Sequence, residues 1–232
     1  MTAHGQDLMA AGTARNSSSS GRIYALSIDS SGRRDTGFDD DGVLLLPRTT
    51  MQARFTTTGR VYAVLKRAGA ARGEFILARY SRRGTLDQNF SGDGRVRVTG
   101  CASGSNLRVI VNPSGLPVVY CQRSGSPSAM LVRRFTSTGV LDRTFSDDGT
   151  AFVDDCCQIA IDAEGRLLVA SAGFGTDLTR LNRAGSLDTD FSNDGKATID
   201  GFVIGGSYDA IFTAPGRIYV VDDRLETLAV QA

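Results

Sequence analysis

Apolar and polar positions alternate along this chain over short stretches, which is typical of β-strands. Arg95 to Val98 alternates strictly, as expected of a strand with one face in water. Val61 to Lys66 and Phe75 to Tyr80 are nearly continuous apolar runs, which favours strands covered on both faces. Met51 to Thr58 precedes them as a further strand. These four segments predict one four-stranded antiparallel sheet within about 50 residues.

The same order of strands recurs along the whole sequence. We therefore predict one repeat array over residues 1–232, with units at about 5–48 (partial), 51–100, 106–154, 157–200 and 207–232 (partial). Leu8 to Leu46 supplies only a second, third and fourth strand. Ala210 to Val230 supplies a first, a second and a third, although the segment around Arg224 also allows a short helix. The predicted strands are therefore too few for five complete sheets.

An eleven-residue motif marks the period. It reads Gly-x-x-Asp-x-x-Phe-x-x-Asp-Gly and follows each predicted third strand. A second set of glycines, each preceding an apolar strand, keeps the same spacing of about 50 residues. The sequence thus predicts an all-β fold, a β-propeller-like array of about five four-stranded antiparallel blades with the first and last incomplete. The four copies of the motif are Gly32–Gly42, Gly84–Gly94, Gly139–Gly149 and Gly185–Gly195.

The positions repeated in the four motif copies have predicted structural roles. The phenylalanine is placed to plug the space between neighbouring sheets, and the first aspartate can accept backbone N–H groups and close an Asx turn. The closing Asp-Gly pair suits backbone positions with positive φ. An arginine five residues before the motif can pair with the motif aspartate, as in Arg79–Asp87, Arg134–Asp142 and Arg180–Asp188. The predicted structural residues are Asp87, Phe90, Asp142, Phe145, Asp188 and Phe191.

Composition narrows the classes of function. The net charge is +1, with 26 basic and 25 acidic residues interleaved, so nucleic acid is not an expected partner. No apolar run reaches the length of a membrane helix, and we expect no membrane insertion. The first residues lack the basic and apolar regions of a secretory signal. We therefore expect either that the protein stays inside the cell or that the chain is a fragment whose true start is missing.

Candidate chemistry is sparse. The acidic loops invite a calcium hypothesis at Asp39, Asp40, Asp41, Asp147 and Asp148, but the EF-hand spacing is absent and we interpret them as turns. With a single histidine and no C-x-x-C motif, we expect no metal, no cofactor and no catalytic residue. A disulfide is expected if the compartment is oxidising, with buried thiols as the alternative; its candidates are Cys101, Cys121, Cys156 and Cys157.

The segments ARYSRRGTLDQNFSGDGRV, TRLNRAGSLDTDFSNDGKA and IAIDAEGRLLVAS closely resemble the delta-60 repeat family. The resemblance covers nearly the whole chain and implies a bacterial β-propeller-like repeat protein, secreted or on the cell surface, in the extracellular space or cell envelope. The first copy departs from the pattern, with Arg34 in place of Leu86 and Ser27 in place of Arg79. That departure puts the integrity of the N-terminal unit in doubt.

These observations favour a non-enzymatic module for binding or scaffolding, with an unknown protein or carbohydrate ligand. The alternative is a hydrolase-type enzyme with its site at the propeller centre. Non-repeated polar residues on the loops of one face would favour the enzyme, and the uniformity of the repeats favours binding. Two incomplete ends would expose sheet edges, which predicts an open ring and self-association.

Overall fold

The computed structural model describes residues 2–4, 7–14, 22–67, 73–105, 107–125, 129–154, 158–172, 175–200, 210–214, 217–221 and 227–231. These residues form nineteen strands and five antiparallel sheets. The first sheet contains β1 (Thr2–His4), β2 (Asp7–Ala14), β3 (Arg22–Ile28) and β4 (Val43–Leu45). The second contains β5 (Thr50–Phe55), β6 (Val61–Lys66), β7 (Phe75–Tyr80) and β8 (Arg95–Val98).

The remaining sheets repeat this order. The third contains β9 (Arg108–Val111), β10 (Pro117–Gln122), β11 (Ala129–Arg134) and β12 (Thr150–Asp154). The fourth contains β13 (Gln158–Ile161), β14 (Leu167–Ala172), β15 (Gly175–Leu181) and β16 (Lys196–Asp200). The fifth contains β17 (Ala210–Ala214), β18 (Arg217–Val221) and β19 (Thr227–Gln231). Within each sheet every strand pairs with the next one in the chain, which is the up-and-down order of a propeller blade.

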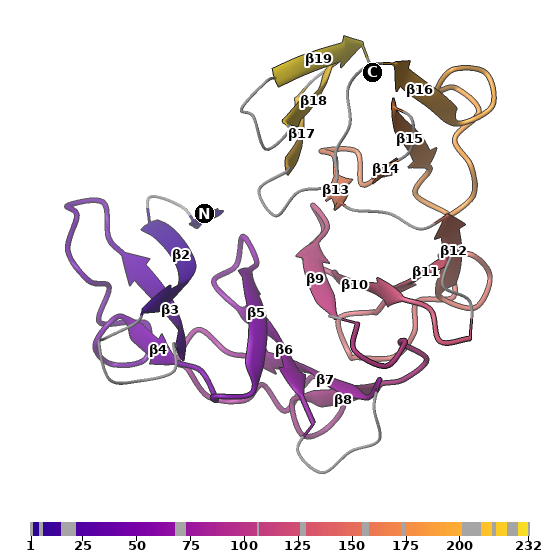
Figure 1. Ribbon diagram of the computed structural model, residues 1–232. Helices are drawn as coiled ribbons and strands as arrows, with labels where there is room; N and C mark the ends of the chain where they lie inside the picture. Colours follow the sequence, from indigo (N-terminus) through magenta and orange to yellow (C-terminus); the bar gives the residue numbers. More distant parts are fainter. Residues whose placement is uncertain are drawn as a thin grey trace.

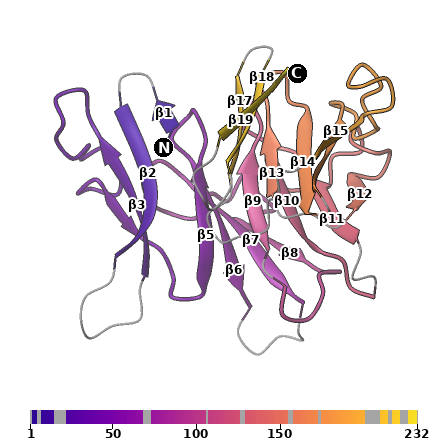
Figure 2. The same cartoon turned by 45° about the horizontal axis from the view of Figure 1, so that its top comes forward.

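The sheets follow one another along an arc around a common centre (Figure 1). Strands β5, β9, β13 and β17 face the centre. Strand β5 packs against β9, β9 against β13, and β13 against β17. Figure 2 shows the strands of successive sheets standing upright side by side along this arc. The all-β, β-propeller-like architecture predicted from the repeat is therefore confirmed.

The two ends of the chain differ from the sequence prediction. The first sheet is complete, because the three residues of β1 pair with the start of β2. A strand this short carries no periodicity that a sequence reading can detect. At the other end, Thr227–Gln231 is a strand paired with β18 and is not a helix. Among the described residues, no sheet combines strands from both ends of the chain.

The hydrophobic core consists of layers between neighbouring sheets. Strand β6 shows why: Val61 and Ala63 pack in the layer toward the first sheet, whereas Tyr62 and Val64 pack in the layer toward the third. A strand with both faces buried needs apolar residues at consecutive positions. This geometry explains the continuous apolar runs of the second and third strands.

The motif loops keep an unusual backbone. Each closing glycine has positive φ, as the sequence predicted, for example 81° at Gly94. The aspartate before it does not, and the prediction for that residue was wrong. Its side chain instead accepts the N–H two residues later, as in Arg95 N to Asp93 Oδ1 at 2.9 Å. The two residues before the aspartate adopt positive φ, and the non-glycine examples are Asp39, Asp40, Ser91, Ser146, Asp147, Ser192 and Asn193.

Among the residues placed in this structure, none belongs to a helix of the length and apolarity needed to cross a membrane.

Candidate functional site

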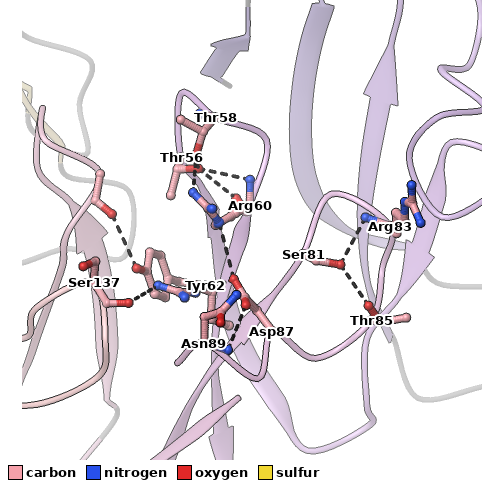
Figure 3. Close-up of polar contacts among 12 residues, drawn as sticks. Thr56, Thr58, Arg60, Tyr62, Ser81, Arg83, Thr85, Asp87, Asn89 and Ser137 are labelled. Carbon is pink, nitrogen blue, oxygen red and sulfur yellow. Dashed lines mark hydrogen bonds and ion pairs between the residues drawn. The ribbon is translucent and has the colours of Figure 1, made fainter. Parts of the chain in front are cut away.

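The motif arginine and aspartate pair within their own sheet, as expected from the sequence. The Nε to Oδ2 distances are 2.9 Å for Arg79–Asp87, 2.7 Å for Arg134–Asp142 and 2.7 Å for Arg180–Asp188. The other carboxylate oxygen accepts a backbone N–H two residues on, as Asp87 does from Asn89 at 3.1 Å (Figure 3). Both oxygens of each aspartate therefore have a structural role.

Two of these arginines also connect neighbouring blades. Arg79 donates to the carbonyl of Ser137 in the third sheet, and Arg134 donates to the carbonyl of Arg183 in the fourth at 2.7 Å. Each guanidinium lies over the ring of its own motif phenylalanine, 4.9 Å from the centroid for Arg134 above Phe145. We call this arrangement of arginine, aspartate, phenylalanine and carbonyl the inter-blade clasp.

The motif phenylalanines fill the spaces between sheets. Phe90, Phe145 and Phe191 are buried, and so is Phe38 in the divergent first copy. The first glycine of the next motif lies against the ring: a Cβ at Gly185 would come within 2.9 Å of Phe145. Gly139 meets Phe90 in the same way, and Gly84 meets Asp39, so each of the first three motifs contacts the motif of the following blade.

The first motif copy achieves the pairing in another way. Ser27 stands where the arginine is expected and donates to Asp35 at 3.2 Å. The charge comes from the next sheet, because Arg82 reaches Asp35 at 3.0 Å. Burial by itself raises the pKa of Asp35, but the hydrogen bonds from Arg82, Gly37 and Ser27 outweigh it and lower the pKa. The N-terminal unit is thus an intact blade despite its divergent sequence.

The calcium candidates have structural surroundings. Asp41 accepts the N–H of Val43 at 2.8 Å, and Asp148 accepts that of Thr150 at 2.7 Å. Desolvation, followed by the charges of Asp41 and Asp40, raises the pKa of Asp39. Within the described ranges, no three His, Cys, Asp or Glu side chains, Asp147 included, come together as a metal site.

A disulfide joins Cys101 to Cys121, both of which are buried in the layer between the second and third sheets. The sequence left the pairing open among four cysteines. Cys156 and Cys157 lie outside the described residues.

One pocket on the motif side contains clasp residues. It has a volume of about 380 Å³ and is lined by Arg134, Asp142, Thr144 and Arg183, among others. Burial favours the protonated form of Asp142, but the hydrogen bonds from Thr144 and the contact with Arg134 outweigh this effect and lower its pKa. These groups already hold two blades together, so we assign this pocket's polar residues a structural role in the inter-blade clasp.

A second pocket, of about 540 Å³, lies at the opposite ends of the strands. β5 and β9 begin there and β6 ends there, whereas the motifs follow the far ends of the third strands. We call it the basic pocket. Its lining residues are Arg48, Thr49, Thr50, Met51, Gln52, Lys66, Leu107 and Arg108.

The backbone holds the basic pocket in a fixed frame. The N–H of Lys66 donates to the carbonyl of Thr49 at 2.8 Å. A β-bulge between Thr50 and Gln52 interrupts the register of β5, and bulges re-aim the side chains beside them. The Gln52 side-chain oxygen accepts the N–H of Val109 in β9 at 2.7 Å, which joins the second and third sheets at the pocket wall.

Arg48, Lys66 and Arg108 were not among the site residues predicted from the sequence. They lie outside the repeated motif, and nothing in their local spacing links them. The available signal was their departure from the repeat: the strand position of Arg108 is occupied by Gln52 in β5 and by Gln158 in β13.

No protein-family model matches the chain, and no curated protein matches it. Solved structures resemble it in shape. A protein of unknown function from Bacteroides caccae has a TM-score of 0.48 at 11% identity, with 97% of this chain and 73% of that chain covered.

Two further structures have similar values. The β-propeller domain of the Trilobed protease from Pyrococcus furiosus has a TM-score of 0.46 at 8% identity, over 94% of this chain and 76% of that chain. The calcium-binding protein regucalcin from Agrobacterium tumefaciens has a TM-score of 0.41 at 15% identity, over 90% of this chain and 66% of that chain. The propeller architecture described here rests on the strand topology of the chain itself.

Proposed function

We propose that the chain is a non-enzymatic β-propeller module that binds a small ligand in the basic pocket. The carrying observation is the division of polar residues between the two sides of the blades. On the motif side, the repeated arginines and aspartates are engaged in clasps and turns. On the other side, non-repeated residues surround about 540 Å³, a volume within the range of ligand sites.

The lining of the pocket suits binding. It combines guanidinium, ammonium, hydroxyl and amide groups with the apolar side chains of Met51 and Leu107. A few placed polar groups on a partly apolar wall are the usual composition of a ligand site. A hydrolase-type site at this position would need a general acid and base, and the lining residues that the structure describes include neither a carboxylate nor an imidazole.

Delta-60 repeat membership and a location in the cell envelope or outside the cell remain part of this proposal. The repeat membership is supported by the agreement of the motif copies and by the position of each copy at the same place in its blade, and the location follows from that resemblance. Self-association through the ends of the arc also stays a prediction, which light scattering of the purified chain decides.

The test separates binding from turnover. The purified chain is titrated by NMR with maltotriose, trigalacturonate, citrate, pyrophosphate and a short neutral peptide, and each probe is then recovered and weighed by mass spectrometry. We expect saturable binding of at least one probe with the probe recovered unchanged. Conversion of a bound probe in proportion to protein concentration, or no binding by any probe at millimolar concentration, would contradict the proposed function.

A further inference from the structure

We propose that the basic pocket selects a ligand carrying two or more anionic groups, either carboxylates or phosphates. This inference rests on the proposed function and names the ligand class of the same site. It starts from charge: of the eight lining residues within the described part of the chain, Arg48, Lys66 and Arg108 are cations, and none of the eight is acidic. The whole protein has a net charge of only +1, so this concentration is local.

The cations come from three segments that the fold brings together. Arg48 precedes β5, Lys66 ends β6, and Arg108 begins β9 in the next sheet. All three side chains are exposed and line the same hollow. One exposed cation attracts an anion only weakly in water. Three cations around one pocket add their attraction for a ligand that carries several negative charges.

Glu74, the carboxylate beside the start of β7, already has cationic partners of its own. Glu74, which precedes the strand partner of Lys66, lies between two arginines and is paired with Arg67 at 2.7 Å and with Arg97. These contacts lower the pKa of Glu74 and keep it ionised. Desolvation lowers the pKa of Arg54, and the positive charge of Arg108 lowers it further against the opposing effect of Tyr120.

The other polar side chains that line the pocket, two threonines and a glutamine, can each donate a hydrogen bond. The Gln52 oxygen is occupied by the N–H of Val109, which leaves the amide NH₂ as the polar group with capacity to spare. Thr50 Oγ1 is buried in the wall, and the described part of the chain supplies it with no hydrogen-bond partner. Buried hydroxyls are normally hydrogen-bonded. Donors and cations together call for a ligand rich in acceptor oxygens, the chemistry of carboxylates and phosphates.

The experiment compares probes of different charge on matched variants. Pyrophosphate, citrate and trigalacturonate are titrated into the full chain by calorimetry, with neutral maltotriose as the control ligand. The test variant is Lys66→Gln combined with Arg108→Gln, because both side chains are exposed and their replacement leaves the core intact. The control variant, Arg143→Gln, removes an exposed arginine from a motif on the opposite side. Equal thermal midpoints establish that all variants are folded.

We expect at least one anionic probe to bind, about 10-fold or more weakly in the double variant and unchanged in Arg143→Gln. Its affinity should fall as salt is added. Tighter pyrophosphate binding assigns a phosphate ligand, and tighter trigalacturonate or citrate binding assigns a carboxylate one. Equal binding to the double variant, or no anion binding at millimolar concentration, overturns the inference. Maltotriose binding with the same affinity in the double variant would support a binding module but contradict an anionic ligand.

Discussion

Removal of the motif phenylalanine tests whether the contacts between motifs hold neighbouring blades together. Phe145 is 1% exposed and belongs to the layer between the third and fourth sheets. It touches Gly185 of the next motif and lies below the Arg134 guanidinium, 4.9 Å away. Phe145→Ala therefore removes a fully buried ring from a junction and leaves a cavity.

The expected loss follows from these contacts. Burial of the ring contributes about 1.5–3 kcal/mol, and the cavity together with the lost cation contact raises the total to about 3–5 kcal/mol. Native domains have only about 5–15 kcal/mol of stability in all. One such substitution should therefore remove a large share of the free energy of unfolding.

Phe152 provides a matched control in the same sheet. Its ring is 53% exposed and stacks with Arg123 at 4.4 Å. Phe152→Ala should cost less than about 1 kcal/mol, because it leaves no cavity. Urea denaturation of both variants measures the difference, and hydrogen exchange locates it. An equal loss in the two variants, or protection in the third and fourth sheets unchanged by Phe145→Ala, would refute the reasoning.

Two other perturbations test the clasp. The pKa of Asp142 is lowered in the folded state, so its ionised form stabilises the fold above the ordinary pKa of 3.8. This stabilisation is lost as the pH falls through the lower pKa of the folded state. Asp142→Asn should therefore flatten the acid side of a plot of thermal midpoint against pH, and an unchanged acid side would contradict this. Gly185→Ala and Gly115→Ala both place a Cβ at positive φ, but only the Cβ at 185 meets neighbouring atoms within 4 Å. Gly185→Ala should therefore lower the free energy of unfolding by about 1 kcal/mol or more beyond the loss in Gly115→Ala, which a lower denaturation midpoint would show. Equal midpoints would show that the inter-motif contact contributes nothing.

Much of the motif could be predicted because its interactions are local. Asp87 bonds a backbone N–H two residues away and pairs with an arginine eight residues earlier, so the strand and its following turn fix both contacts. Four copies at one period made these roles visible as a pattern. The positive φ of Ser91 and its equivalents was missed, because serine, which occupies this position in three of the four copies, is not a residue type that favours positive φ.

The candidate pocket could not be predicted in this way. Lys66 and Arg108 lie in different repeats, and neither position is shared by all copies. Their proximity depends on a bulge in β5 and on the contact between Gln52 and the backbone of β9. Such contacts follow from how one sheet packs on the next, which the sequence pattern of a single unit does not encode.

By itself, the sequence determined the strand order, the four-stranded unit and the structural character of the motif, since strand pairing and turn closure act within tens of residues. Tertiary structure decided what lies between units. It assigned Arg134 a second partner 49 residues away, supplied Asp35 with a charge from Arg82 and paired Cys101 with Cys121. The physical reason is that the contacts between sheets depend on the twist and stacking of whole blades, and these are set by the packing of buried layers rather than by spacing along the chain.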